Sequence, residues 1–282
     1  MARSLIDLSA KADLQLLVDV VAAMRRAIPT MQPLLVGAMA RDILLHYAHG
    51  IQLSRATSDM DFAFAVGSWQ EFTEMRAALI GGGEFLPVDN NLHLLKYQGK
   101  TRVDVLAFGG VEEADHTIAW PPAGDVIMNV SGYREAFADS IVVLLPGGER
   151  VDVVSLPALA ALKLFAWRDR RRITTKDAID LWSILENFLE AGNESRLYEA
   201  IQLFEQPDYD YKRGGAWLLG QDMRTLLSGG DGTALQQALE ILATEASSED
   251  LELARDSGAR DTQAVVDLLR ATLAGLQGKP HP

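Results

Sequence analysis

Two stretches of the sequence are the most informative about the fold: LLVGAMARD, at residues 34–42, and RATSDMDFA, at residues 55–63. The first stretch predicts a short apolar strand that turns at two small residues into a helix. The second predicts a strand in which Asp59 and Asp61 share one face, because side chains two residues apart project the same way. Two carboxylates held that close repel each other unless a cation lies between them. Oxygen ligands favour Mg²⁺ or Mn²⁺, so this pattern points to a metal-dependent enzyme acting on a nucleotide.

The composition limits the class of protein. The chain has 282 residues, enough for two domains, and 48% hydrophobic and 23% charged residues are typical of a globular protein. It contains no cysteine, which excludes disulfides, thiolate zinc sites and cysteine nucleophiles. We find no signal peptide and no apolar run of the roughly 18 residues that span a bilayer, and expect a cytoplasmic protein with no membrane partner. The net charge of −13 argues against a broad nucleic-acid-binding face.

The hydrophobic pattern changes near residue 155 and predicts two domains. Residues 1–155 mix helical and strand patterns, which predicts an α+β fold with a mixed, mostly antiparallel sheet flanked by helices. Within it we expect an amphipathic helix over residues 5–28 and a long connection over residues 109–132. Residues 156–282 show helical patterns only, which predicts a helical C-terminal domain.

Asp104 is the candidate third carboxylate. It lies in the apolar stretch TRVDVLAF, at residues 101–108, where burying a charge is costly unless the charge is paired or functional. In the functional interpretation it lies on a strand beside Asp59 and Asp61, where it shares the metal or acts as general base for the attacking hydroxyl. In the alternative it forms a structural ion pair with Arg102 or a nearby lysine at the strand edge.

The turn at Gly37 and Ala38 is a candidate phosphate site. Small residues between a strand and a helix let backbone N–H groups approach a phosphate, helped by the helix dipole. They also occur wherever strands and helices pack closely. Arg41 and Arg55 can orient a phosphate as well, although Arg41 can instead pair with Asp42.

Residues 163–177 form the basic part of this acidic chain, with six basic and two acidic residues. Their functional interpretation is a surface that receives a triphosphate or an RNA backbone. The alternative is an ordinary solvated connection between two helices. Lys163 itself lies among apolar residues and on the same helix side as Arg170, and its alternative is a lysine that extends from a buried helix to solvent.

Together, these segments resemble the nucleotidyltransferase superfamily with the DNA polymerase β-like fold. More narrowly they are similar to the AbiEii/AbiGii group of nucleotidyltransferase toxins of type IV toxin–antitoxin systems. The resemblance covers most of residues 34–185, and Ala38 stands where the group usually has Gly or Ser. It is carried by VGAMARD at 36–42, RATSDMDF at 55–62, VD at 103–104, LPALAALKLFAWRDR at 156–170 and KDAIDL at 176–181.

The resemblance implies transfer of a nucleoside monophosphate from an NTP to a hydroxyl acceptor, with release of pyrophosphate. It implies Mg²⁺ or Mn²⁺ at Asp59, Asp61 and Asp104, and β,γ-phosphates at the turn of Gly37 and Ala38.

For the later motifs, the resemblance implies that Lys163 contacts the triphosphate, with Arg170 among the nearby arginines that neutralise charge. Asp177 would be the later acid of the nucleotide site. The acceptor would be a tRNA 3′ end, a small molecule or a protein hydroxyl, and a cognate antitoxin would be a partner. The alternative from another class is a non-catalytic module that binds nucleotide or a partner on the same fold.

Overall fold

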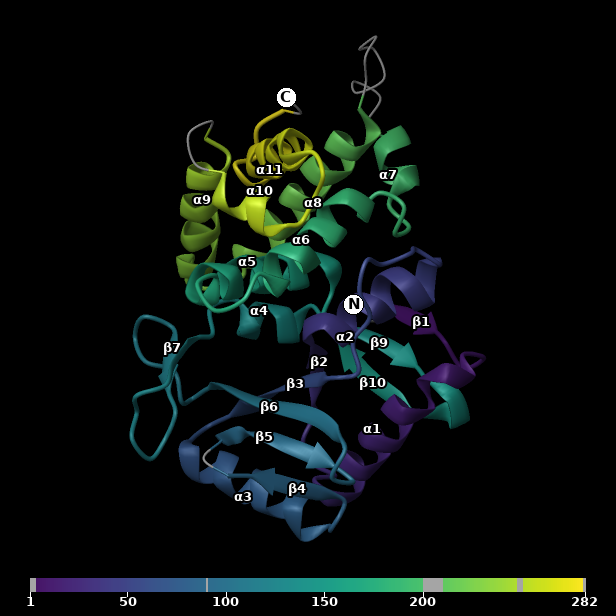
Figure 1. Cartoon of the computed structure of the whole chain (residues 1–282), viewed down its shortest axis with the longest axis vertical. Coiled ribbons are helices and arrows are strands. Elements are labelled where there is room, and N and C mark those ends of the chain that lie inside the picture. Colours follow the sequence, from purple (N-terminus) through teal and green to yellow (C-terminus); the bar gives the residue numbers. More distant parts are fainter. Residues whose placement is uncertain (1–3, 90, 200–209, 248–250, 281–282) are drawn as a thin grey trace. The chain divides into compact units, whose positions relative to one another are not determined.

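The computed structural model of the chain describes residues 4–89, 91–199, 210–247 and 251–280 (Figure 1). The contacts between residues divide the chain into two compact units. The first unit is drawn from the residues up to Ile43 and from Ser54–Ser155. The second is drawn from Leu44–Leu53 and from the residues that follow Ser155.

The first unit is built on an eight-stranded mixed sheet. Three strand pairs in it are parallel, β1 with β9, β10 with β2 and β3 with β6, and the other four are antiparallel. The sheet order is β1 (Leu5–Asp7), β9 (Ile141–Leu144), β10 (Arg150–Val153), β2 (Leu34–Val36), β3 (Met60–Val66), β6 (Thr101–Gly109), β5 (Asn91–Tyr97) and β4 (Phe85–Val88).

Strands β3 and β6 lie inside the sheet and are apolar on both faces. On β3, Phe62 and Phe64 are fully buried, as are Val103 and Val105 on β6. Strands covered on both faces read as continuous apolar runs, which is the pattern seen here. Helices α1 (Gln15–Ala27) and α3 (Trp69–Gly81) pack against each other in this unit, and α3 also contacts β3 and β4 (Figure 1).

The helix predicted over residues 5–28 is wrong at its start. Leu5–Asp7 form strand β1, parallel to β9, and α1 begins only at Gln15. The Asp7 carboxylate accepts a hydrogen bond of 2.9 Å from the Ser9 backbone N–H, a local turn that ends the strand.

The long connection predicted over residues 109–132 contains structure of its own. It holds a hairpin of β7 (Thr117–Ala119) and β8 (Ile127–Asn129), and the short helix α4 (Tyr133–Ala138) follows it.

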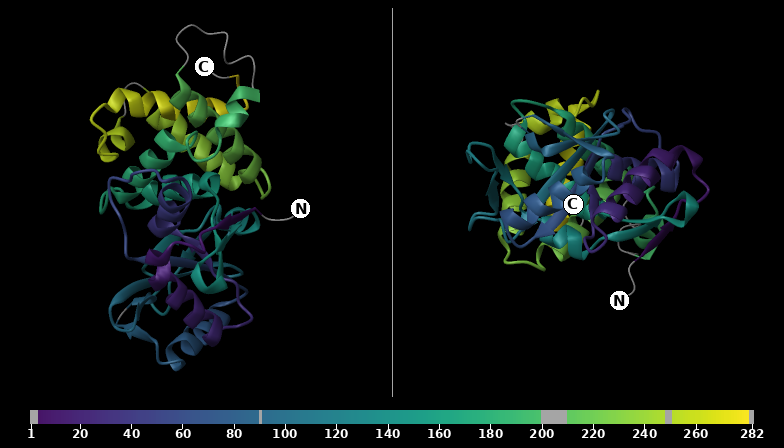
Figure 2. Two further views of the ribbon diagram at one scale, coloured as in Figure 1. Left: turned by 90° about the vertical axis from the view of Figure 1, so that its right-hand side faces the viewer. Right: turned by 90° about the horizontal axis from the view of Figure 1, so that it is seen from below.

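The second unit is helical in its described part, which confirms the predicted α+β class of a mixed sheet followed by helices (Figure 2). Among the described residues, no helix is both long and apolar enough to cross a membrane. The helices are α5 (Leu156–Arg170), α6 (Lys176–Asn187), α7 (Glu194–Glu199), α8 (Tyr211–Leu227), α9 (Thr233–Glu245), α10 (Glu252–Asp256) and α11 (Thr262–Leu276).

Two glycines allow α8 and α11 to approach each other closely. A Cβ atom at Gly220 would lie 2.1 Å from the Thr272 carbonyl oxygen, and one at Gly275 would lie 2.1 Å from the Trp217 carbonyl oxygen. Both distances are far below van der Waals contact, so the backbones can meet only where no side chain is present.

We therefore expect Gly220→Ala to destabilise the protein. The added methyl group would meet backbone that cannot move without separating the two helices, and overpacking of this kind typically costs about 1–3 kcal/mol. Thermal unfolding followed by circular dichroism would show a lower melting temperature. Gly81→Ala is the control, because its Cβ would meet nothing within 4 Å. An unchanged melting temperature for Gly220→Ala would contradict the close crossing.

Candidate active site

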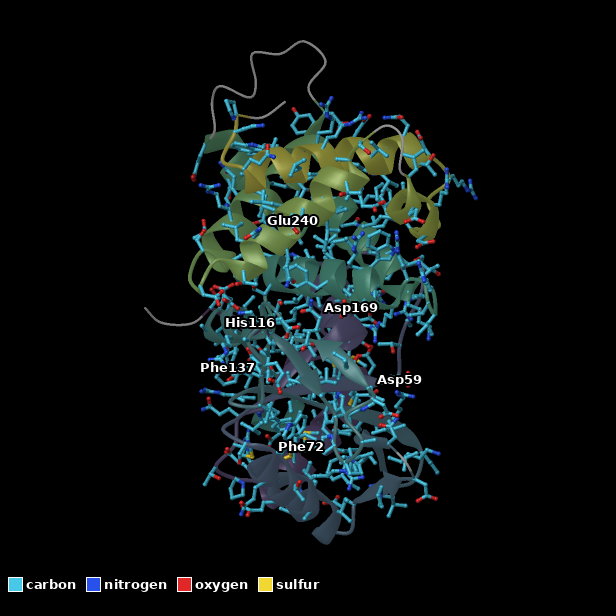
Figure 3. The ribbon with its side chains drawn as sticks, turned by 90° about the vertical axis from the view of Figure 1, so that its left-hand side faces the viewer. Asp59, Phe72, His116, Phe137, Asp169 and Glu240 are labelled. Carbon is cyan, nitrogen blue, oxygen red and sulfur yellow. The ribbon has the colours of Figure 1, made fainter. Side chains whose placement is uncertain are left out.

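The pairing of β3 with β6 brings two predicted site carboxylates together. The two strands are parallel, and Asp61 lies directly opposite Asp104 in their register. Neighbouring strands are about 4.8 Å apart, so the side chains of paired residues lie next to each other on one face. Asp59 lies just before β3 and is exposed (Figure 3), and its backbone N–H donates to Thr57 Oγ1 at 3.2 Å.

Gly37 is packed directly against the Asp61 carboxylate. A Cβ atom at Gly37 would lie 2.1 Å from Asp61 Oδ2, and its φ of +69° belongs to the left-handed region that favours glycine. Val36, the last residue of β2, pairs with Asp61 across the antiparallel β2–β3 ladder. The predicted turn therefore opens next to a carboxylate of the site, and Ala38 follows it as a buried residue.

Asp104 is buried and paired with Arg102. The guanidinium binds both carboxylate oxygens, with Nε donating to Oδ2 at 2.7 Å and an Nη to Oδ1 at 3.0 Å. This is the ion pair that the sequence offered as the alternative role for Asp104. The hydrogen bond to Asp104 raises the pKa of Arg102, and the charges of Asp104, Asp59 and Asp61 add to this effect against burial. Arg102 is thus the cation bound to Asp104.

His93 on β5 is a second neighbour of Asp104. Its Nε2 lies 4.0 Å from Asp104 Oδ1, and its ring lies against Trp120, with 5.1 Å between the ring centroids. Burial lowers the pKa of His93, partly opposed by the charge of Asp104. The sequence reasoning did not propose Arg102 or His93 as site residues. The signal for Arg102 was its place two residues before Asp104, on the same face of the strand.

Arg41 lies in the core of the first unit. It is fully buried, its Nε donates to Asp42 Oδ1 at 2.9 Å, and an Nη donates to the Arg55 carbonyl oxygen at 2.8 Å. Asp42 Oδ2 in turn accepts from the Thr57 backbone N–H at 3.3 Å. Arg41 and Asp42 therefore fasten the segment that leads into Asp59, and the Arg55 backbone is part of that attachment.

In the second unit, three predicted residues form one charge cluster with Asp180. Lys163 Nζ lies 3.0 Å from Asp177 Oδ1 and 2.7 Å from Asp180 Oδ2, and Arg170 binds both oxygens of Asp177 at 2.7 and 3.0 Å. Lys163 and both aspartates are buried, whereas about half of the Arg170 side chain is exposed. The sequence reasoning missed Asp180, although its place three residues after Asp177 puts both on one helix face.

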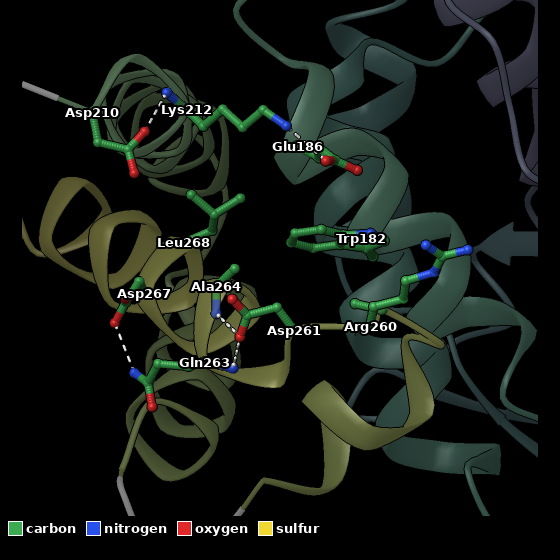
Figure 4. Close-up of a pocket in the computed structure, with 11 residues that line it drawn as sticks. Trp182, Glu186, Asp210, Lys212, Arg260, Asp261, Gln263, Ala264, Asp267 and Leu268 are labelled. Carbon is green, nitrogen blue, oxygen red and sulfur yellow. Dashed lines mark hydrogen bonds and ion pairs between the residues drawn. The ribbon is translucent and has the colours of Figure 1, made fainter.

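The second unit also contains a cavity of about 480 Å³ at α6, α8 and α11 (Figure 4). Trp182 forms part of its wall, and its acidic residues already bind other groups. Asp210 and Asp261 accept backbone N–H groups at the starts of α8 and α11, and Glu186 accepts from Lys212 Nζ at 2.7 Å. Asp267, the fourth acid of the wall, accepts a hydrogen bond from Gln263 Nε2 at 2.9 Å, so each of these acids already has a partner.

The predicted carboxylates of the first unit are of a chemical type that binds divalent cations. Carboxylate oxygens are the ligands that Mg²⁺ and Mn²⁺ prefer, and the glycine at position 37 leaves room for the Asp61 carboxylate. Within the described residues, however, no three acidic or histidine side chains converge in an arrangement that could hold a metal ion. Both oxygens of Asp104 are bonded instead to Arg102.

Comparison with known families gives the class of protein to which this chain belongs. The chain belongs to the AbiEii family, since the sequence model described as "Nucleotidyl transferase AbiEii toxin, Type IV TA system" matches residues 34–274. The family resemblance predicted from the motifs is thereby confirmed, and the chain is a transferase that moves a nucleotidyl group.

Two solved structures match the chain at low sequence identity and low TM-score. ANT(2")-Ia in complex with adenylyl-2"-tobramycin is 13% identical, with a TM-score of 0.38, over 67% of this chain and 94% of that chain. An antigenic nucleotidyltransferase-like protein from Paracoccidioides brasiliensis is 17% identical, with a TM-score of 0.40, over 71% and 92%. A search of curated proteins finds no match.

Arg41→Met is expected to destabilise the first unit strongly. It would leave the buried Asp42 carboxylate without its guanidinium partner, and breaking a buried ion pair typically costs about 3–5 kcal/mol. Denaturant unfolding measures this loss. The control is Arg26→Gln, whose exposed pair with Glu84 should contribute less than about 1 kcal/mol. Equal effects of the two substitutions would show that Arg41 does not hold the segment before β3.

Asp177→Asn is expected to weaken the second unit in a pH-dependent way. Burial acts to raise the pKa of Asp177, but the hydrogen bond from Arg170 and the charge of Lys163 hold it below its usual value. A lowered folded-state pKa stabilises the protein above the unfolded-state pKa of about 3.9, and this stabilisation is lost as the pH falls through the folded-state pKa.

At neutral pH we expect Asp177→Asn to lower the free energy of unfolding by about 3 kcal/mol, because it removes the carboxylate that binds both Lys163 and Arg170 and leaves Lys163 with Asp180 alone. The difference from the parent protein should shrink below about pH 4. Unfolding curves at several pH values test this, with the exposed Glu190→Gln as control. A difference that stayed constant down to pH 2 would exclude a charge effect.

Proposed function

We propose that this nucleotidyltransferase is metal-dependent and transfers a nucleoside monophosphate from an NTP to a hydroxyl group, releasing pyrophosphate. The observation that supports it best is the register of Asp61 with Asp104 on neighbouring strands, beside the turn at Gly37. We assign Asp59, which is exposed and lies two residues before Asp61, as the third carboxylate. Such a set fits phosphoryl transfer, where catalysis consists mainly of positioning and charge stabilisation.

Asp59, Asp61 and Asp104 are the residues we assign to hold Mg²⁺ or Mn²⁺. A cation bound there would stabilise the negative charge of the triphosphate and of the attacking oxygen. Asp104 is also our candidate to accept the proton of the attacking hydroxyl. The turn at Gly37 and Ala38, which opens a helix, is our candidate to receive the β,γ-phosphates through backbone N–H groups.

The arginines divide into supporting and contacting residues in this proposal. Arg41 supports the site through the segment before β3, because its guanidinium is fully buried. Arg55 belongs to the same segment. Its side chain is our candidate in the first unit to orient a phosphate.

In the second unit, the half-exposed Arg170 is the group we assign to contact the nucleotide. Lys163 and Asp177 take the positioning role, since both are buried and paired with each other. They hold the end of α5 and the start of α6 in place for Arg170.

The acceptor we propose first is the 3′ end of tRNA, in the cytoplasm where NTPs and tRNA are found, with a cognate antitoxin as partner. The assignment rests on the chain's membership of a toxin family of type IV systems. A small molecule is the second candidate, and the net charge of −13 favours it over a large polyanion. Salt-sensitive binding to tRNA would favour the RNA acceptor.

The test is a transfer assay with Mg²⁺ or Mn²⁺, each α-labelled NTP and total tRNA. Single variants Asp59→Asn, Asp61→Asn and Asp104→Asn should lose at least about 10²–10³-fold in rate, the loss seen when one electrostatic contact to the transition state is removed. Asp115→Asn, an exposed acid in the first unit, is the matched control and should keep full activity.

The position of the label identifies the acceptor. Label on tRNA that requires all three aspartates would support the proposal and name the base. Label on the protein itself would redirect the search to protein hydroxyls. Absence of transfer to tRNA, to small hydroxyl compounds and to protein, with NTP binding unchanged in the aspartate variants, would contradict it and favour a binding module.

A further inference from the structure

Arg102 provides the positive charge that the structure sets against Asp104. Its guanidinium binds both oxygens of Asp104, and it also interacts with the charges of Asp59 and Asp61. The Asp104 side chain is 9% exposed, whereas that of Arg102 is 47% exposed. The carboxylate is therefore held in place, while the guanidinium lies on a flexible stem that solvent reaches.

A guanidinium and a divalent cation cannot both bind Asp104 well. A carboxylate has enough lone pairs for two partners, but two cations within a few ångströms of one another repel strongly where solvent screening is poor. Arg102 thus reduces the affinity of the carboxylate set for a free metal ion.

We propose that Arg102 is a resident counter-ion that competes with the divalent cation for Asp104 and leaves it when a nucleoside triphosphate enters with its cation. This inference rests on the proposed function. The triphosphate brings both replacements at once. Its cation neutralises Asp104, and its phosphate oxygens accept the planar guanidinium, which matches phosphate geometry.

The exchange has two consequences. Asp104 and Arg102 each keep an oppositely charged partner, because Asp104 gains the cation and Arg102 gains the phosphate oxygens. Metal and nucleotide should also bind cooperatively, since neither alone offers a partner to both Asp104 and Arg102. By linkage, the cation should tighten nucleotide binding by the same factor as the nucleotide tightens cation binding.

The experiment measures Mn²⁺ binding directly, from the electron paramagnetic resonance signal of the free ion. Each protein is titrated alone and then with each of the four α,β-methylene nucleoside triphosphates. In the parent protein, the dissociation constant of Mn²⁺ measured with the best of these nucleotides should be at least tenfold lower than that of Mn²⁺ and the same nucleotide without protein.

Arg102→Gln should bind Mn²⁺ alone roughly tenfold more tightly than the parent protein, the value of one charged hydrogen-bonded pair. The nucleotide should then increase the Mn²⁺ affinity of this variant by a smaller factor than it does in the parent protein. Arg134→Gln is the matched control, because Arg134 is also a half-exposed arginine paired with a buried carboxylate, Glu112. It should behave as the parent protein does.

Two further variants make the result unambiguous. Arg102→Lys retains the charge without the two-point contact and should give an intermediate Mn²⁺ affinity, which keeps the test available if Arg102→Gln does not fold. Adding Asp61→Asn to Arg102→Gln should abolish the gain. A gain that survives Asp61→Asn, or Mn²⁺ binding by Arg102→Gln no tighter than in the parent protein, would overturn the inference.

The titration requires no turnover, so it separates this inference from the proposed function. If the protein transfers nucleotide and Arg102→Gln has unchanged Mn²⁺ affinity, the inference about Arg102 is wrong and the proposed function stands. Tighter Mn²⁺ binding in Arg102→Gln, in a protein that transfers to no acceptor, would establish the competition and contradict the proposed reaction.

Discussion

The parallel pairing of β3 with β6 is the constraint on which the site depends. It sets Asp61 opposite Asp104 in the middle of a sheet whose neighbouring positions are apolar and buried. Acids placed together in such surroundings must have a compensating charge, because desolvation and mutual repulsion both oppose ionisation. The chain provides Arg102, and a glycine turn provides the space that the Asp61 carboxylate occupies. The site is thus assembled from a strand register, a turn and an arginine.

Other buried aspartates among the described residues are also held by basic side chains. Asp42 is held by the fully buried Arg41, and Asp177 is held by Lys163 and Arg170. Buried ion pairs of this kind add little net stability, but removing one partner is severe because the other charge is left uncompensated. The main effect of these ion pairs is to fix the position of the backbone around them. Each fixes a segment of the predicted motifs, the residues before β3 in one case and the junction of α5 with α6 in the other.

The role of Arg102 links the structure to the chemistry of the family. If the carboxylates bound a metal ion permanently, they would need no arginine. Without any cation, their negative charges would repel one another and destabilise the folded site. A guanidinium that is half exposed, and bound to a buried acid, stabilises the folded site while remaining free to turn toward an anionic ligand. On this view the arginine lets the sheet fold without metal and makes loading depend on the nucleotide.

Local patterns in the sequence predicted much of this protein. The fold class, a mixed sheet followed by helices, agrees with the prediction, because alternation and helical periodicity act over a few residues. Patterns of the same kind predicted Asp59, Asp61 and Asp104 as site residues, and the strand register sets Asp61 opposite Asp104. Tertiary structure alone decided that residues 5–7 form a strand, since their partner β9 lies more than 130 residues away. It also decided that Asp104 pairs with Arg102 and that Arg41 is buried, because burial and pairing depend on strand register, which no local pattern contains.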